Sequence, residues 1–282
     1  MTRLATIFKS RLSCSAFFYL WFVSQINAQD TASWLSKEIT MDGLPSEWKD
    51  ADLKKDSKAG HLYCIANDSS ILYIGLLLKD EILKTKFSNA GFSIFLNSEG
   101  KEKRSFSVDF PLPDAEYDIA SDPARLMDLK RIQYMGMLHA NQYRLSGFNG
   151  GNGKQNTSDE NKNGVQLALG ITDSAFLFYE VKIPLPAIFK QMTSFKEISQ
   201  QNIAVCFSFN AMTKPSGQSS QSSSSAVPPG PVSGRGGRGG TQPDPQNSGF
   251  PARGNAGQDF GQMENLFHSS KTWKTVSLAK PL

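Results

Sequence analysis

Alternation of apolar and polar residues is clearest in residues 176–186, FLFYEVKIPLP. Because successive side chains in a β-strand point to opposite faces, this pattern predicts a core strand. The strand should end at Pro184 and Pro186, since proline has no N–H to donate to a neighbouring strand. One face of the predicted strand carries Leu177, Tyr179, Val181 and Ile183, and the other carries Phe176, Phe178, Glu180 and Lys182.

Similar apolar runs on both sides of this stretch predict an all-β chain. Two pairs of runs are joined by short polar turns, 67–70 and 172–174, which favour hairpins. Short helices are predicted over 123–131, where Asp122 would be the N-cap and Pro123 the first residue, and over 185–192, and a single helical turn is predicted at 46–48. The remaining predicted strands are 38–41, 61–66, 71–79, 92–96, 105–110, 131–138, 142–145, 165–171, 203–211 and 271–278, with a polar surface loop over 147–164.

Composition changes abruptly after the strand at 203–211. Residues 214–259 are dominated by Ser, Gly, Pro, Gln and Asn, and such a segment buries too little apolar surface to offset its chain entropy. We therefore expect a β-sandwich domain over 30–212, a disordered low-complexity loop over 213–270, and a final strand of the same domain in 271–282. The alternative is that the domain ends at Ala211 and that 271–282 is a separate docking peptide.

The N-terminus has the order of a secretory signal peptide, residues 1–28. Basic residues precede a short apolar run, 12–26, and Ala28 provides a small residue at the cleavage point. The alternative is an uncleaved anchor, although the apolar run is shorter than a membrane span requires. The prediction is a secreted, periplasmic or cell-envelope protein with no membrane span after cleavage.

Charge argues against nucleic acid as a partner. The signal contains three of the 30 Lys and Arg residues and none of the 26 acidic residues, which leaves a mature chain near neutrality. A near-neutral protein has no electrostatic attraction for nucleic acid or for an anionic membrane surface. The RGGRGG run within the low-complexity segment is therefore interpreted as a spacer and not as an RNA-binding box.

Candidate chemistry is sparse. Cys64 and Cys206 either pair in an oxidising compartment or remain buried thiols. Asp114, Glu116 and Asp118 lie close enough in sequence to contribute to a Ca²⁺ site, with a solvated acidic loop as the alternative. No nucleophile-elbow, His-x-x-x-His or phosphate-loop motif is present. A carboxylate pair for glycoside hydrolysis stays open, because its geometry is spatial and not sequential.

Four short stretches in a fixed order carry a family resemblance. They are residues 39–43 (ITMDG) followed by Trp48, 71–74 (ILYI) followed by Asp80, 179–184 (YEVKIP), and 273–278 (WKTVSL). Together they resemble the carbohydrate-binding family 9-like modules, which are related to DOMON domains. The resemblance implies an exported, antiparallel β-sandwich of jelly-roll type, often with a sugar-binding end.

The leading hypothesis is therefore an exported, non-catalytic binding module whose expected ligand is a glycan. Trp48, Asp42 and Glu180 are the candidate binding residues, since aromatic faces stack on sugar rings and carboxylates bind hydroxyls. Alternatively, Trp48 is a residue of the hydrophobic core. Glu180 alternatively has a structural role in its strand. Two other functions remain: a scaffold that binds a protein of the cell envelope, and a glycan hydrolase.

Overall fold

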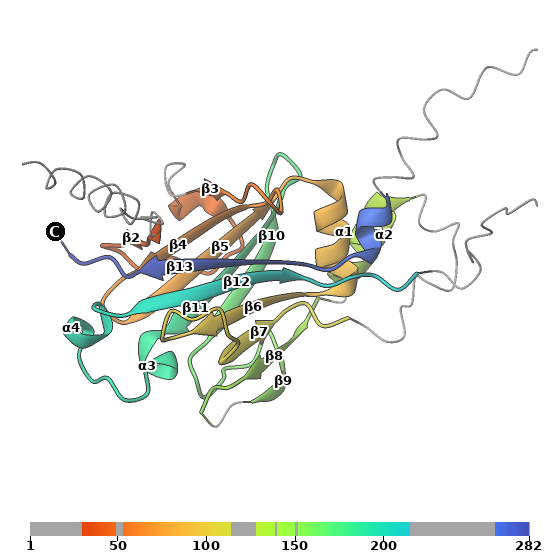
Figure 1. Cartoon of the computed structure of the whole chain (residues 1–282). Coiled ribbons are helices and arrows are strands. Elements are labelled where there is room, and N and C mark those ends of the chain that lie inside the picture. Colours follow the sequence, from red (N-terminus) through yellow and green to blue (C-terminus); the bar gives the residue numbers. More distant parts are fainter. Residues whose placement is uncertain are drawn as a thin grey trace, which may run out of the picture.

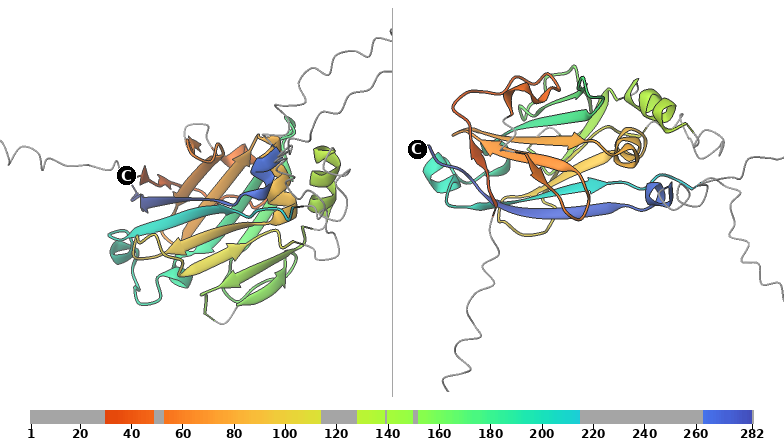
Figure 2. Two further views of the ribbon diagram at one scale, coloured as in Figure 1. Left: turned by 45° about the vertical axis from the view of Figure 1, so that its right-hand side comes forward. Right: turned by 90° about the horizontal axis from the view of Figure 1, so that it is seen from above.

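Two β-sheets pack face to face in the computed structural model, which describes residues 30–48, 53–113, 128–138, 140–149, 152–214 and 263–281 (Figure 1). The right view of Figure 2 shows the two layers from above. The predicted all-β sandwich is thus confirmed. Its sheets are mixed, because two strands of two residues each pair with their neighbours in parallel.

The larger sheet has seven strands. In spatial order they are β1 (Asp30–Thr31), β13 (Ser270–Ser277), β12 (Asn202–Phe209), β6 (Phe92–Asn97), β7 (Phe106–Asp109), β8 (Gln142–Ser146) and β9 (Gly153–Asn156). The strand expected at 271–278 is thus β13, and it pairs antiparallel with β12. This pairing returns the chain to the sandwich after the long low-complexity stretch.

The smaller sheet has six strands, and the predicted core strand lies second from one edge. In order they are β10 (Gln166–Ile171), β11 (Leu177–Pro184), β5 (Ile71–Leu78), β4 (Leu62–Asn67) and β2 (Ser33–Trp34), while β3 (Lys54–Lys55) also pairs with β4. Both predicted hairpins, β4–β5 and β10–β11, are confirmed. Register places Glu180 of β11 between Ala168 of β10 and Gly75 of β5.

The inward face of β11 lies in the main core. Tyr179 is fully buried and stacks on Phe110 at 5.2 Å between ring centroids, and its ring also meets Phe87 at 5.4 Å. Leu177, Val181 and Ile183 belong to the same cluster. The face predicted to pack is therefore the face that packs.

Short helices and 3₁₀ turns connect or flank the strands of the two sheets. They are α1 (Glu81–Ala90), α2 (Leu129–Leu138), α3 (Leu185–Ile188), α4 (Phe195–Ile198) and the 3₁₀ turns η2 (Pro45–Glu47) and η6 (Asn265–Phe267). Figure 1 shows α1 and α2 side by side at one end. Gly136 permits this close approach, because a Cβ there would lie 2.5 Å from the Ser88 carbonyl oxygen.

Several local predictions are wrong. Residues 38–41 form no strand, and the strand predicted over 131–138 is the helix α2. That helix begins at Leu129, later than the helix predicted over 123–131, whose first residues lie outside the described part of the chain. The helix over 185–192 ends early, at Ile188. Isolated apolar periodicity did not separate helix from strand in these short segments.

Other elements were not predicted. Helix α1 follows β5 directly, and its N-cap Asp80 accepts a hydrogen bond from the Leu83 N–H at 2.9 Å. Strand β9 lies inside the predicted surface loop over 147–164. The disordered segment was predicted to run to residue 270, yet residues 263–270 are structured, and Leu266 of η6 is buried against Ala90 and Met212.

The predicted signal peptide and the acidic loop with Asp114, Glu116 and Asp118 lie outside the described residues. Cys64 and Cys206 are both buried and form no disulfide, so the buried-thiol interpretation fits. Within the described ranges, no helix is long and apolar enough to cross a membrane.

Candidate functional site

Glu180 is a fully buried carboxylate on the outward face of β11. Its Oε1 accepts a hydrogen bond from the Gly43 N–H at 2.7 Å, and its Oε2 accepts one from the indole Nε1–H of Trp48 at 3.0 Å. Both donors belong to residues 38–48, which we call the outer segment. Each carboxylate oxygen thus has its own donor, and together they hold this segment against the six-stranded sheet.

Neighbouring side chains on the same face of β11 hold the rest of the outer segment. Phe178 meets the Trp48 ring edge-on, with centroids 6.3 Å apart, and Lys182 forms an ion pair with Glu38. Phe178, Glu180 and Lys182 occupy every second position of β11, so all three side chains reach the outer segment from the same face of the strand. The outward face of β11 is an attachment surface for a distant segment of the chain.

Two glycines allow the outer segment to lie this close. Gly43 has φ +77°, a conformation that favours glycine. A Cβ added to Gly170 of β10 would lie 2.4 Å from the Gly43 carbonyl oxygen. The backbones of the outer segment and β10 therefore touch at this point.

The pKa of Glu180 is raised to about 7, chiefly by burial and in smaller part by the nearby Asp42 and Glu47 carboxylates, whereas its two N–H donors act to lower it. Trp48 is only 5% exposed and packs against Phe178 and Tyr73, so neither face of its ring is open to a ligand in this conformation. Asp42 is exposed, and its Oδ1 accepts a hydrogen bond from the Leu44 N–H. The structure thus brings the three sequence-predicted residues together, with two of them buried.

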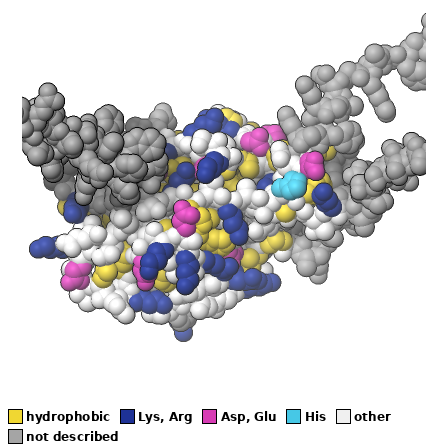
Figure 3. All heavy atoms as spheres, viewed as in Figure 1, with side chains coloured by type: hydrophobic (Ala, Val, Ile, Leu, Met, Phe, Trp, Pro, Cys, Tyr) yellow, Lys and Arg dark blue, Asp and Glu magenta, His cyan; other side chains and the backbone are white. Residues whose placement is uncertain are grey.

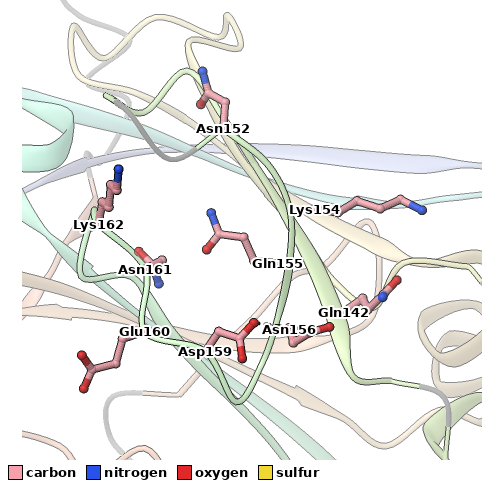
Figure 4. Close-up of a pocket in the computed structure, with 9 residues that line it drawn as sticks. All are labelled: Gln142, Asn152, Lys154, Gln155, Asn156, Asp159, Glu160, Asn161 and Lys162. Atoms are coloured by element: carbon pink, nitrogen blue, oxygen red, sulfur yellow. Dashed lines mark hydrogen bonds between the residues drawn. The ribbon is translucent and has the colours of Figure 1, made fainter.

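Open polar cavities lie elsewhere, around the loop between β9 and β10. One has a volume of about 500 Å³ and the other about 490 Å³, and both are lined by Asp159, Glu160 and Asn161. Figure 4 shows Gln155 and Asn161 pointing into the space between β9 and this loop, whereas Lys154 points away from it. The first cavity is also lined by Gln142, Asn152, Asn156 and Lys162, and the second by Met41, Tyr143, Thr157, Ser158 and Gln166.

A hydrogen-bond network holds the walls of these cavities in place. The Tyr143 hydroxyl donates to Gln155 Oε1 at 2.8 Å and accepts from Asn161 Nδ2 at 2.9 Å. Asn161 Oδ1 in turn accepts hydrogen bonds from the backbone N–H groups of Asn163 and Val165. Because Tyr143 is 2% exposed, the network is anchored in the core, and the polar walls are pre-organised.

The outer segment contributes to the second cavity through Met41, two residues before the glycine bound by Glu180. Glu180 and Trp48 are therefore positioning residues for a cavity wall and not part of its open surface. Sequence reasoning missed the cavities, because it treated 147–164 as a loop with little to bury. The cluster of Asn, Gln, Asp and Glu between Asn152 and Asn161 was the available signal.

Aromatic residues also lie on the outer face of the seven-stranded sheet. Phe95 and Trp273 flank Cys206 in register and are half-buried. The cationic groups of Arg104 and Lys271 lie over the Phe95 ring, at 5.0 and 5.5 Å from its centroid. Figure 3 shows several Lys and Arg side chains on this face with hydrophobic side chains visible between them, and two of the cations cover the Phe95 ring.

Within the ranges the structure describes, no group of three or more His, Cys, Asp and Glu side chains could hold a metal ion. The Ca²⁺ prediction concerned the loop outside those ranges.

Comparison with known proteins finds a likeness of architecture alone. No protein-family model and no curated protein matches the sequence. A carbohydrate-binding module of family 9 from Caldicellulosiruptor kristjanssonii, in complex with cellotriose, is similar at 9% identity with a TM-score of 0.31, covering 66% of this chain and 78% of that one. Another family 9 module from that organism, in complex with glucose, shows 11% identity and a TM-score of 0.29, covering 65% and 78%. Scores this low assign neither a family nor a ligand.

Proposed function

We propose that this chain is an exported, non-catalytic glycan-binding protein that holds its ligand in the cavities around the β9–β10 loop. The observation that carries the proposal is a pair of adjoining cavities that share Asp159, Glu160 and Asn161 and have walls of amide, carboxylate and hydroxyl groups. Sugar rings present many hydroxyl groups, each of which can donate and accept a hydrogen bond. Planar amides and carboxylates on a fixed scaffold complement such a ligand.

Size and pre-organisation fit the same ligand class. Cavities of about 500 and 490 Å³ lie within the range of small-ligand sites, roughly 300–1,000 Å³, and together suit a short oligosaccharide. The Tyr143–Gln155–Asn161 network fixes the side chains before the ligand arrives. A site whose polar groups are already ordered loses less conformational entropy on binding.

The carboxylates of the cavities support binding without catalysis. Glycosidases place two carboxyl groups on either side of the scissile bond, about 5–9.5 Å apart. Asp159 and Glu160 are instead consecutive residues on one exposed loop. Export rests on the predicted signal peptide over 1–28 and places the glycan outside the cytoplasm.

A glycan array probed with the mature chain tests the proposal. We expect binding to at least one glycan series, with no release of reducing ends on prolonged incubation. If the chain binds no glycan on the array but specifically captures a protein of the cell envelope, the scaffold function would hold and glycan binding would be wrong. Release of reducing ends that is lost on removal of one carboxylate would replace it by hydrolysis.

A further inference from the structure

A third cavity, of about 590 Å³, lies where α1 begins. It is lined by α1 as far as Lys86, by the turn at 58–60, and by Asn265 and residues 268–270. Its lining includes Lys58, Asp80, Lys86, Asn265, His268 and Ser270. It shares no lining residue with the two cavities described above.

Lys86 is the unusual member of this lining, because it is a lysine only 3% exposed. Its ammonium donates to the His268 backbone carbonyl at 2.6 Å and forms no ion pair with a carboxylate of the described residues. An ammonium has three donors, and burying a charge without a counter-ion is costly. Burial accordingly lowers the pKa of Lys86.

Lys84, two residues earlier on the same helix, is a buried lysine whose ammonium has both a carboxylate partner and a carbonyl acceptor. Its ammonium forms an ion pair with Glu81 at 2.6 Å and donates to the Ala175 carbonyl at 3.1 Å. Lys84 does not line the cavity, whereas Lys86 does. The buried lysine that lacks a carboxylate partner is therefore the one beside open space.

Other groups of the lining are available to a ligand. The Ser270 hydroxyl is buried and has no hydrogen-bond partner among the described residues. Lys58 is exposed at the rim, and Asn265 and Ser269 add an amide and a hydroxyl. The lining contains one carboxylate, Asp80, whose Oδ1 already caps α1. Two lysines against one carboxylate leave a net positive cavity with several hydroxyl-binding groups.

We propose that this cavity binds the carboxylate or sulfate group of a monosaccharide-sized acid, with Lys86 and Lys58 on the anion and Ser270 and Asn265 on its hydroxyls. An anion would supply the counter-charge that Lys86 lacks and an acceptor for the Ser270 hydroxyl. The volume is sufficient for one sugar ring. This site is independent of the glycan site around the β9–β10 loop.

Calorimetric titration of the mature chain tests the proposal, with glucuronate, glucose 6-sulfate and glucose as probes. We expect binding of at least one acid and none of glucose at the same concentrations. Lys86→Met should weaken acid binding at least tenfold, and Lys58→Ala, at an exposed position, should weaken it several-fold. Lys84→Met is the matched control on the same helix and should bind as the wild type does.

Three other outcomes would contradict the proposed anion site. Absence of binding for both acids, equal binding of glucose, or unchanged binding in Lys86→Met and Lys58→Ala would overturn it. Lys58→Ala keeps the test valid if Lys86→Met does not fold. Glu160→Ala alters the other two cavities and should leave acid binding unchanged. Failure of the anion site can therefore be distinguished from failure of the glycan site around the β9–β10 loop.

Discussion

Glu180 and Lys86 are both buried charged groups, and the structure treats them in opposite ways. Each oxygen of Glu180 has a donor from the outer segment, and Glu180 lines none of the three cavities described above. Lys86 has one carbonyl acceptor and lines a cavity of about 590 Å³. The paired charge of Glu180 attaches one segment of the chain to another, whereas the partly paired charge of Lys86, beside open space, is where we propose that a ligand binds.

A large effect should come from removing the indole that covers Glu180. Trp48→Ala deletes a large buried side chain and leaves a cavity in the small outer core, which should lower the free energy of unfolding by about 3–5 kcal/mol. Urea denaturation measures it. Leu44→Ala, at a 40% exposed position of the same segment, is the control and should change stability by less than about 0.5 kcal/mol. Equal effects would show that Trp48 does not hold the outer segment.

Glu180→Ala should destabilise the fold by roughly 2–6 kcal/mol, because two buried N–H donors lose their acceptor at about 1–3 kcal/mol each. Glu180→Gln keeps one acceptor oxygen and should lose less. The same denaturation experiment compares them. If both substitutions are neutral, the carboxylate is not what fastens the outer segment.

The pH dependence of stability sharpens the same point. The pKa of Glu180 is about 7 in the folded state against 4.5 as its ordinary value, so the folded state keeps the proton longer than the unfolded state does. Stability from this group is therefore present below pH 4.5 and is lost as pH rises to about 7. We expect the stability of the wild type relative to Glu180→Gln to fall across that window. A rise would mean that the N–H donors outweigh burial.

His61 acts in the opposite direction, which is why the comparison with Glu180→Gln is needed. Burial lowers the pKa of His61 from 6.5 to about 4, so its contribution to stability is lost as pH falls through that range. In the wild type the two effects oppose each other between pH 4.5 and 6.5. Subtracting the curve of the variant isolates Glu180.

The smallest expected effect contrasts the two buried lysines of α1. Lys84→Met removes an ion pair and a hydrogen bond and should cost about 1–2 kcal/mol. Lys86→Met removes a charge with one acceptor, and such a replacement is often neutral or stabilising. Chemical denaturation of both variants measures the difference. A greater loss for Lys86→Met would assign Lys86 a structural role and weaken the contrast with Glu180.

Periodicity predicted the two faces of β11 correctly, and apolar runs joined by turn residues predicted the hairpins β4–β5 and β10–β11. It placed Glu180 on the outward face but did not predict its partners, because Gly43 is 137 residues away along the chain. Helix α1 was missed because several of its buried positions are Lys, Thr and Ser. The cavities were missed because their walls depend on how one loop lies against β9, which no local pattern encodes.

The central claim is that recognition lies in the cavities around the β9–β10 loop and not at the buried Trp48–Glu180 pair. The most direct measurement is the affinity of the mature chain for its best array glycan, determined by calorimetry for Glu160→Ala and Glu102→Ala. Both residues are exposed, but only Glu160 lines the cavities. We predict at least a tenfold loss for Glu160→Ala and wild-type affinity for Glu102→Ala. Equal affinities in the two variants would contradict the account.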